Sequence, residues 1–379
     1  MTLEYSSTVA SGLFAIFLIV LLGPFLVKKI EHNLEIFLFS MGVVAITINS
    51  VFLKASSNPG IDPVESLPNW NLQLVEKVLI DPIEITLAVL FAGLFFHYGR
   101  GHIRAIMQRI QTKIPLKIVV FAIIVVLGLL SSVITAIIAS LLLVEMISTL
   151  QLSRKTMVNL TIIACFAIGL GAALTPIGEP LSTIVIKTKL KEDFFYLLRL
   201  LGIFIIPGVI AFGIIGIFFA SKKEKREVKE GIEMTTEDHE NIGDVIVRGI
   251  KVYVFVMALV LLGTGFTPII EWYVTKIAGE SLYWANIVSA ILDNATLAAA
   301  EVDPSMIIPG TFDPTIKIKS VLMGLLVSGG MLIPGNIPNI ISANKLGITS
   351  KEWARLGIPL GVGTMLVYFI ILYGPSYIS

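Results

Sequence analysis

The chain has 379 residues, of which 55% are hydrophobic and only 15% are charged, and its mean hydropathy is +0.89. Soluble domains carry about 25% charged residues because their surfaces face water, so this composition excludes an ordinary soluble protein and predicts one that resides in the lipid bilayer. The formal net charge of +1 gives no general attraction to nucleic acid. No basic region precedes the first apolar stretch, so we expect a retained span there and not a cleaved signal peptide.

A membrane-spanning helix needs about 20 mostly apolar residues. Eight segments meet this requirement, and in chain order they are 8–27, 34–53, 78–97, 159–185, 194–220, 245–267, 318–343 and 354–373. Two other apolar regions do not fit. Region 118–150 is too long for one span and too short for two, and region 283–300 is short and carries Asp293 and Asn294 at its middle.

The placement of Lys and Arg decides how these two regions are treated, because cytoplasmic loops are enriched in basic residues. The basic clusters lie at 28–29, 100–117, 154–155, 222–229 and 345–355. If 118–150 crossed the membrane once, the clusters at 154–155 and 222–229 would both be external. A hairpin that enters from the cytoplasm and returns places every cluster inside. With 283–300 as a second hairpin from the outside, the acidic loop 301–313 and both termini are external. The alternative is that both regions simply span.

Two halves of the chain repeat one pattern across a charged linker. The offset from Ser131 to Leu174 equals the offset from Ser289 to Leu332, and both later motifs read Leu-x-Pro-x-x-x-Pro, at 174–180 and 332–338. An odd number of crossings between matched elements gives the halves opposite orientations, as in secondary transporters. We therefore expect two N-terminal helices and an external loop (1–77), a first inverted repeat (78–220), a cytoplasmic linker (221–244) and a second inverted repeat (245–379).

The paired prolines predict broken helices. Proline removes a helical hydrogen bond and glycine weakens a helix, so each Leu-x-Pro-x-x-x-Pro motif is expected to unwind its span. Unwound backbone at membrane depth persists only where protein or a water-filled cavity satisfies it. Matching interruptions in two halves indicate a transport site, whereas the alternative is a pair of packing kinks. The expected fold is an all-α polytopic membrane protein, with an inverted-topology repeat, two re-entrant helical hairpins and two broken transmembrane helices.

Ionisable groups inside the membrane are functional candidates because they are expensive to bury there. Asp293 is the strongest, since Ser289, Asn294 and Thr296 surround it in sequence with hard oxygen ligands suited to sodium or a proton. Glu179 lies between the prolines of the first break, close to Thr175. Asn336 and Asn339 are the neutral groups of the second break. The alternatives are that Glu179 or Asp293 caps a short helix.

These residues carry a family resemblance. The Ser-x-x-x-Asp-Asn-x-Thr segment at 289–296, paired with a proline-rich break in each half, resembles the ion transporter superfamily. The break at 173–180 is similar to that of NhaD-type sodium/proton antiporters. The resemblance implies paired cation sites formed by hairpin tips and breaks, and usually a homodimer. Carried over by position, the first site would use Ser131, Ser132, Thr135 and Glu179, and the second would use the residues listed above around Asp293, Asn336 and Asn339. Thr135-Ala136 departs from the family pattern, since many relatives have Asp-Asn or Asn-Thr there.

The expected function is secondary active transport that exchanges sodium or lithium for protons by alternating access. The alternative is sodium-coupled symport of a small anion or neutral solute, and a passive channel suits paired hairpins less well. No zinc-protease, aspartic-protease or nucleophile-elbow motif is present, so we do not expect an enzyme. The expected location is the cell membrane, as a multi-pass protein. The expected partners are the bilayer and small inorganic ions, with no resident cofactor and no nucleic acid.

Overall fold

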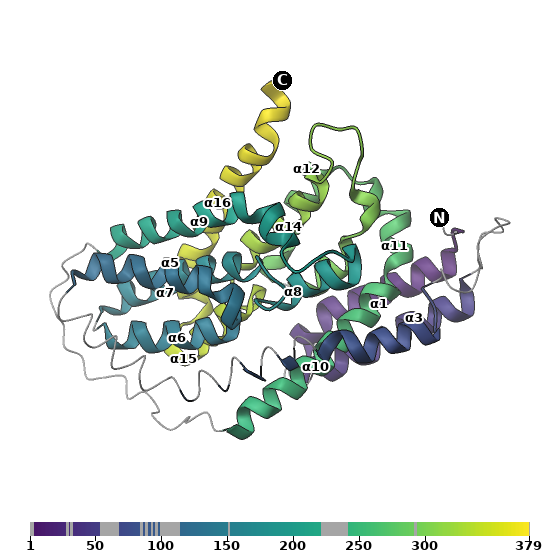
Figure 1. The fold of residues 1–379 in the computed structure, drawn as a ribbon, viewed down its shortest axis with the longest axis horizontal. Helices are drawn as coiled ribbons and strands as arrows, with labels where there is room; N and C mark the ends of the chain where they lie inside the picture. The colour runs from purple at the N-terminus through teal and green to yellow at the C-terminus, as the bar shows by residue number, and fades with distance from the viewer. Residues whose placement is uncertain are drawn as a thin grey trace.

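The computed structural model describes residues 4–27, 30, 33–53, 68–83, 86–87, 90–91, 94, 98, 114–150, 152–220, 242–291 and 294–378. Every regular element among them is a helix, as Figure 1 shows. The helices of the first part of the chain are α1 (Ser7–Leu26), α3 (Leu34–Phe52), α5 (Leu116–Ile134), α6 (Ala136–Thr149), α7 (Arg154–Ala172), α8 (Pro180–Thr183), the π-helix η1 (Ile184–Leu190) and α9 (Tyr196–Ala220). Those of the second part are α10 (Ile242–Gly265), α11 (Thr267–Trp272), η2 (Val274–Lys276), α12 (Gly279–Ala285), η3 (Asn286–Ala290), α13 (Asn294–Glu301), η4 (Pro304–Met306), α14 (Ile316–Gly329), η5 (Ile333–Gly335), α15 (Ile337–Leu346) and α16 (Ser350–Ile378).

Six helices in the described part are long and apolar enough to cross a membrane: α3, α5, α7, α9, α10 and α16. They make this a multi-pass membrane protein. Helices also occupy the expected N-terminal span at α1. Within the expected span 78–97, the described residues 78–83, 86–87, 90–91 and 94 are helical.

Two helices end at the paired prolines. Helix α7 ends at Ala172, and turns lead through Glu179 into α8 and η1. Helix α14 ends at Gly329, and the short η5 and the extended residue Asn336 lead into α15. Both interruptions coincide with the Leu-x-Pro-x-x-x-Pro motifs, as the loss of helical hydrogen bonds at proline predicts.

Helices α5 and α6 occupy the overlong region 118–150 and are separated by one residue. Thr135 has φ 76° and ψ 150°, outside the helical region, and this single residue ends one helix and starts the next. Helix α6 ends at Thr149 and α7 begins at Arg154. Helix α7 lies beside α5 with its end near the end of α5, because the Ser131 hydroxyl donates to the Ile168 carbonyl. The α5–α6 pair therefore returns to the side of the molecule on which it starts.

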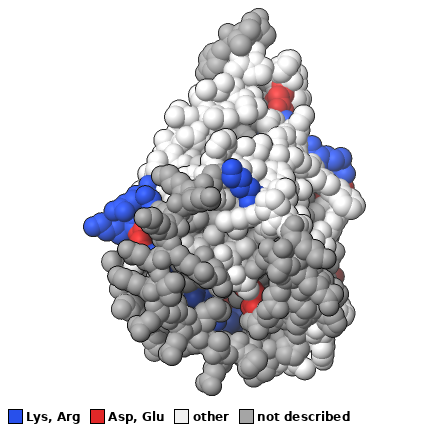
Figure 2. All heavy atoms as spheres, turned by 90° about the vertical axis from the view of Figure 1, so that its left-hand side faces the viewer, with Lys and Arg blue, Asp and Glu red and all other residues white. Residues whose placement is uncertain are grey.

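Arg154 joins the beginning of α7 to the end of α15 and the beginning of α16. The Arg154 guanidinium at the start of α7 donates to the carbonyls of Leu346 and Gly347 at the end of α15, and to the Glu352 carboxylate near the start of α16. Figure 2 views the left-hand side of Figure 1 and shows Lys and Arg side chains at several places on this face, with fewer Asp and Glu.

The helices pack into one large group and one smaller group. The large core joins α5–α9 with α12–α16, while the smaller cores join α1, α3, α10 and α11. Figure 1 shows the smaller group at the lower right, beside the stacked helices α5, α6, α7, α9 and α15. Gly42 of α3 lets α10 approach, because a Cβ there would lie 2.6 Å from the Leu261 Cβ. Most of the expected linker 221–244 lies outside the described residues, and α10, which follows it, packs chiefly on N-terminal α3.

Candidate ion site

The first helix break contacts the junction between α5 and α6. The backbone N–H of Ala136 donates to the Gly178 carbonyl at 2.8 Å. The Thr175 hydroxyl donates to the Ser132 carbonyl at the end of α5. The structure therefore brings the predicted first-half residues Ser131, Ser132, Thr135, Thr175 and Glu179 into one region.

The hydroxyl groups of this first region form hydrogen bonds within the protein. The Ser131 hydroxyl donates to the Gly128 carbonyl at 2.6 Å and lies 3.0 Å from that of Ile168. The Ser132 hydroxyl donates to the Leu129 carbonyl at 2.8 Å. The Thr135 hydroxyl oxygen accepts the backbone N–H of Ile138 at 3.4 Å. These side chains are buried, and their polar groups are satisfied by nearby backbone.

Glu179 is a buried acid in extended backbone. Its φ is −155° and its ψ is 159°, it precedes α8, and only 5% of its surface is exposed. Its carboxylate makes no capping hydrogen bond to α8, so the structure does not support a helix cap as its role. The acid is held at the unwound segment, as the sequence pattern predicts.

The second break carries an incompletely satisfied amide. The Asn339 side-chain nitrogen donates to the Gly329 carbonyl at 2.9 Å and to the Leu332 carbonyl at 2.8 Å. These bonds close the unwound segment over the end of α14. The Asn339 Oδ1 atom is buried and accepts no hydrogen bond from the described part of the chain. Buried polar atoms normally have a partner, so this oxygen is an exception among the described residues.

Two more buried polar atoms of the second half share this property. Neither Ser289 Oγ nor Asn294 Nδ2 has a hydrogen-bond partner among the described residues. A half-turn of the Asn294 amide would present its oxygen in place of its nitrogen. Ser289 lies close to the break, because a Cβ on Gly329 would lie 3.7 Å from Ser289 Oγ. The predicted second-site residues Ser289 and Asn339 therefore both approach the end of α14.

Backbone carbonyl groups converge on the same place. A Cβ on Gly335 would lie 2.6 Å from the carbonyl oxygens of Gly329 and Ser289, and 2.8 Å from that of Ala290. Only glycine fits this approach, since real Cβ atoms do not come so close to oxygen. The second break is thus surrounded by oxygen atoms, which are the ligands that hard cations prefer.

The remaining predicted residues of the second site are Asp293, Thr296 and Asn336. Asp293 lies outside the described residues, and the backbone of Thr296 is helical in α13 but its side chain is not described. Asn336 is buried in extended backbone just before α15. Its side chain lies against α7, because a Cβ on Gly169 would lie 2.4 Å from Asn336 Nδ2.

Corresponding residues meet in both halves. The offset that relates Ser131 to Ser289 also relates Gly171 to Gly329. A Cβ on Gly171 would lie 3.2 Å from Ser131 Oγ, and one on Gly329 would lie 3.7 Å from Ser289 Oγ. The same offset relates Thr135, at the α5–α6 junction, to Asp293. The two halves therefore place equivalent serines beside equivalent glycines at the ends of α7 and α14.

Sequence reasoning missed the buried Lys189 and the partly buried Glu301. Lys189 of η1 is buried, and its ammonium donates to the Gly263 carbonyl near the end of α10 at 2.6 Å. The only feature of the sequence that could have indicated this burial is that Lys189 lies four residues beyond the expected span 159–185. Glu301 was expected in an external loop, but it is the last residue of α13 and accepts a hydrogen bond from the Asn286 side chain at 2.8 Å. This bond joins the segments on either side of Asp293.

The second break offers oxygen ligands. In the part of the chain that the structure describes, no group of three His, Cys, Asp or Glu residues is placed to hold a metal ion. The oxygen atoms at the second break come from hydroxyl, amide and backbone carbonyl groups, which suit alkali cations and not soft metals.

Comparisons with known proteins identify the family. No curated protein matches the chain. Residues 10–374 match the family described as "Protein of unknown function (DUF1646)". This match covers nearly the whole chain, including both helix breaks and every predicted site residue, and the protein therefore belongs to the DUF1646 family.

Proposed function

We propose that this protein is a secondary active transporter that exchanges sodium or lithium for protons by alternating access. The observation that carries the proposal is the second helix break, where Ser289 Oγ and Asn339 Oδ1 are buried without hydrogen-bond partners in the described structure. An unsatisfied buried polar atom costs about 1–3 kcal/mol. A bound sodium ion would supply the missing interactions.

Asp293 completes this site in the proposal. It directly precedes Asn294, whose amide is buried, and it follows η3, which bears Ser289. Sodium and a proton compete for one carboxylate, so binding of either ion excludes the other. A carrier that changes its accessible side only when this carboxylate is occupied would perform obligate exchange.

The proposed architecture has two inverted repeats with a re-entrant hairpin in each, as in the ion transporter superfamily. The matched contacts of Ser131 with Gly171 and of Ser289 with Gly329 support it, as does the return of α5–α6 to its starting side. We expect a cell-membrane homodimer with external termini, because relatives of that superfamily fold are usually dimeric and the basic residues mark the opposite side.

The proposal gives the two halves different tasks. The carboxylate of Glu179 is the acidic group of the first break, and its burial at the unwound segment makes it the candidate second proton carrier. The hydroxyls of Ser131, Ser132 and Thr135 are occupied by backbone partners. Sodium binding is therefore assigned chiefly to the second half.

Transport by purified protein in lipid vesicles tests the proposal. Addition of sodium outside vesicles that are acidic inside should release protons from the wild type, and lithium should do the same. Asp293→Asn should lower this flux by at least about tenfold, equivalent to about 1.4 kcal/mol. Asp193→Asn, in an exposed pair with Arg199, is the control and should retain flux. Full sodium-dependent proton flux in Asp293→Asn would refute the site.

Sodium-coupled symport of a small anion is the second candidate. The buried ammonium of Lys189, which follows the first break, is the feature that favours it, because anion carriers usually offer positive charge. Sodium uptake that requires an added anion, without proton movement in the opposite direction, would select symport over exchange.

A further inference from the structure

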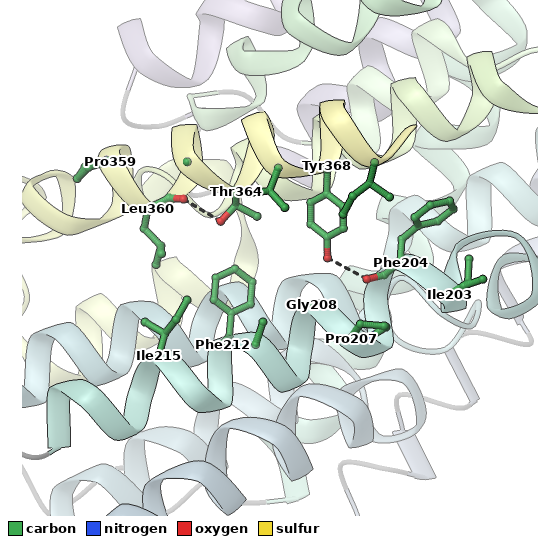
Figure 3. A pocket seen from close by; sticks show the side chains of 14 residues that line it. Ile203, Phe204, Pro207, Gly208, Phe212, Ile215, Pro359, Leu360, Thr364 and Tyr368 are labelled. Atoms are coloured by element: carbon green, nitrogen blue, oxygen red, sulfur yellow. Dashed lines mark hydrogen bonds between the residues drawn. The ribbon is translucent and has the colours of Figure 1, made fainter. Parts of the chain in front are cut away.

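A hydrophobic cavity lies between α9 and α16, and neither helix break contributes to its lining. Its volume is about 550 Å³, within the usual range of small-molecule sites. Figure 3 shows its lining, in which Pro359 and Leu360 of α16 lie on the side of Ile215 of α9, and Tyr368 lies over Pro207 and Phe204. The two helices therefore run in opposite directions along the cavity.

The polar side chains of the lining are already engaged. The Tyr368 hydroxyl donates to the Phe204 carbonyl at 2.9 Å, and the Thr364 hydroxyl donates to the Leu360 carbonyl at 2.8 Å. The other twelve lining residues are apolar or glycine. A polar ligand would find no free partner on these walls, so the occupant must be apolar over this length.

The length of the cavity matches one leaflet of a bilayer. On α9 its lining extends from Ile203 to Ile215, which is ~18 Å at 1.5 Å per residue. The hydrocarbon core of a bilayer is about 30 Å thick, so one leaflet contributes about half of that. Both helices are of membrane-spanning length. A single acyl chain fits this environment and this length.

A basic residue follows the cavity at one end. Arg355 lies one helical turn before Pro359, on the same stripe of α16 that lines the cavity. It is exposed, and it forms no ion pair with another side chain in the described part of the chain. This end belongs to the side on which Arg154 joins the ends of α15 and α16. An anionic headgroup placed here would meet positive charge.

We propose that the cavity between α9 and α16 binds one phospholipid, with an acyl chain along the helices and an anionic headgroup at Arg355. The walls supply apolar contact and Arg355 supplies the charge preference. The site is separate from the ion site, so the lipid is a structural ligand of the helix pair and not a transported solute.

Gly363 gives a direct test, because it lines the cavity and a Cβ there meets nothing within 4 Å. Gly363→Leu should fill the cavity without a clash and should be tolerated by the helix. The control is Gly374→Leu, on the same helix but outside the cavity, where a Cβ meets only Ile370 at 3.7 Å.

The measurement is native mass spectrometry of the full-length protein released from micelles with equimolar phosphatidylglycerol and phosphatidylcholine. The wild type and Gly374→Leu should retain one phosphatidylglycerol per chain. Gly363→Leu should lower retention about tenfold. Arg355→Gln should lower the preference for phosphatidylglycerol about fivefold, as expected for one basic residue beside an anionic lipid.

Two results would overturn the proposal. One is unchanged lipid retention in Gly363→Leu. The other is a wild-type dimer that Gly363→Leu converts to a monomer with the same bound lipid, which would assign the cavity to a second copy of the chain. Neither result depends on sodium, so the lipid site can fail while the transport proposal stands.

Discussion

Ser131 and Ser289 occupy corresponding positions in the two halves of the chain, yet their hydroxyl groups have different environments. Ser131 donates to the carbonyls of α5 and α7, whereas Ser289 has no hydrogen-bond partner in the described structure. The same contrast holds for the breaks that face them. Thr175 of the first break donates to Ser132, while Asn339 of the second leaves its oxygen unused.

This contrast separates the hydroxyl groups of the first break, which the backbone satisfies, from the Ser289 hydroxyl and the Asn339 amide oxygen of the second. A break whose polar groups are satisfied by backbone is stable when empty. A break with open oxygen atoms is less stable until something binds, and a ligand that binds only the folded state then stabilises the protein. Sodium should therefore raise the thermal stability of this protein through its second half.

The largest effect is expected from closing the second break sterically. Gly335→Ala would place a methyl group against three carbonyl oxygens, and overpacking of this kind costs about 1–3 kcal/mol or more. We expect a lower melting temperature in detergent and no further stabilisation by sodium. Gly363→Ala, whose added methyl group meets nothing within 4 Å in α16, is the matched control and should melt at or slightly above the wild-type temperature. Normal sodium stabilisation of Gly335→Ala would show that the carbonyl cluster is not the site.

The paired serines give an intermediate effect that tests the comparison directly. Ser131→Ala removes hydrogen bonds, so it should lower stability by about 1 kcal/mol and leave sodium affinity unchanged. Ser289→Ala removes a hydroxyl without a partner, so it should cost little stability but weaken sodium binding about tenfold. Isothermal titration with sodium and thermal unfolding separate these outcomes. If both substitutions change affinity equally, the two halves share the binding.

The smallest effect is expected at Asp313, which lies outside both breaks and serves as a control for the substitutions within them. Partial burial acts to raise the pKa of Asp313, but hydrogen bonds from Lys319 and Thr315 outweigh it and hold that pKa below its usual value. A lowered pKa stabilises the folded state above the unfolded-state pKa, and this contribution is lost as the pH falls through the folded-state pKa. Asp313→Asn should cost roughly 0.5–1 kcal/mol near pH 7. Unfolding at decreasing pH should show the difference disappear, and sodium stabilisation should not change.

Local chemistry made part of this structure predictable. The paired prolines interrupt α7 and α14 because proline cannot donate a helical hydrogen bond, whatever surrounds it. The overlong region 118–150 divides into two helices at Thr135. The length of the apolar stretch predicted a hairpin there but not the residue at which it turns.

The hydrogen-bond partners of the site residues could not be predicted, because they come from distant parts of the chain. Ser131 is engaged because the Ile168 carbonyl of α7 lies beside it, and no pattern around Ser131 indicates this contact. Lys189 escaped notice because it follows the apolar span, although a π-helix turns it into the protein toward Gly263. Glu301 was assigned to a loop because the segment that follows it is acidic and includes proline. In the structure it is the last residue of α13, and its carboxylate accepts a hydrogen bond from the Asn286 side chain.

Two successive residues of α7 connect the halves. The Ile168 carbonyl receives the Ser131 hydroxyl of the first half, and Gly169 leaves only enough space for the Asn336 side chain of the second. The peptide unit between Ile168 and Gly169 therefore contacts residues of both halves. A displacement of Asn336 would open space next to the anchor of Ser131, and a side chain at position 169 would force the breaks apart. The contact between α7 of the first half and Asn336 of the second thus depends on the absence of a methyl group at Gly169.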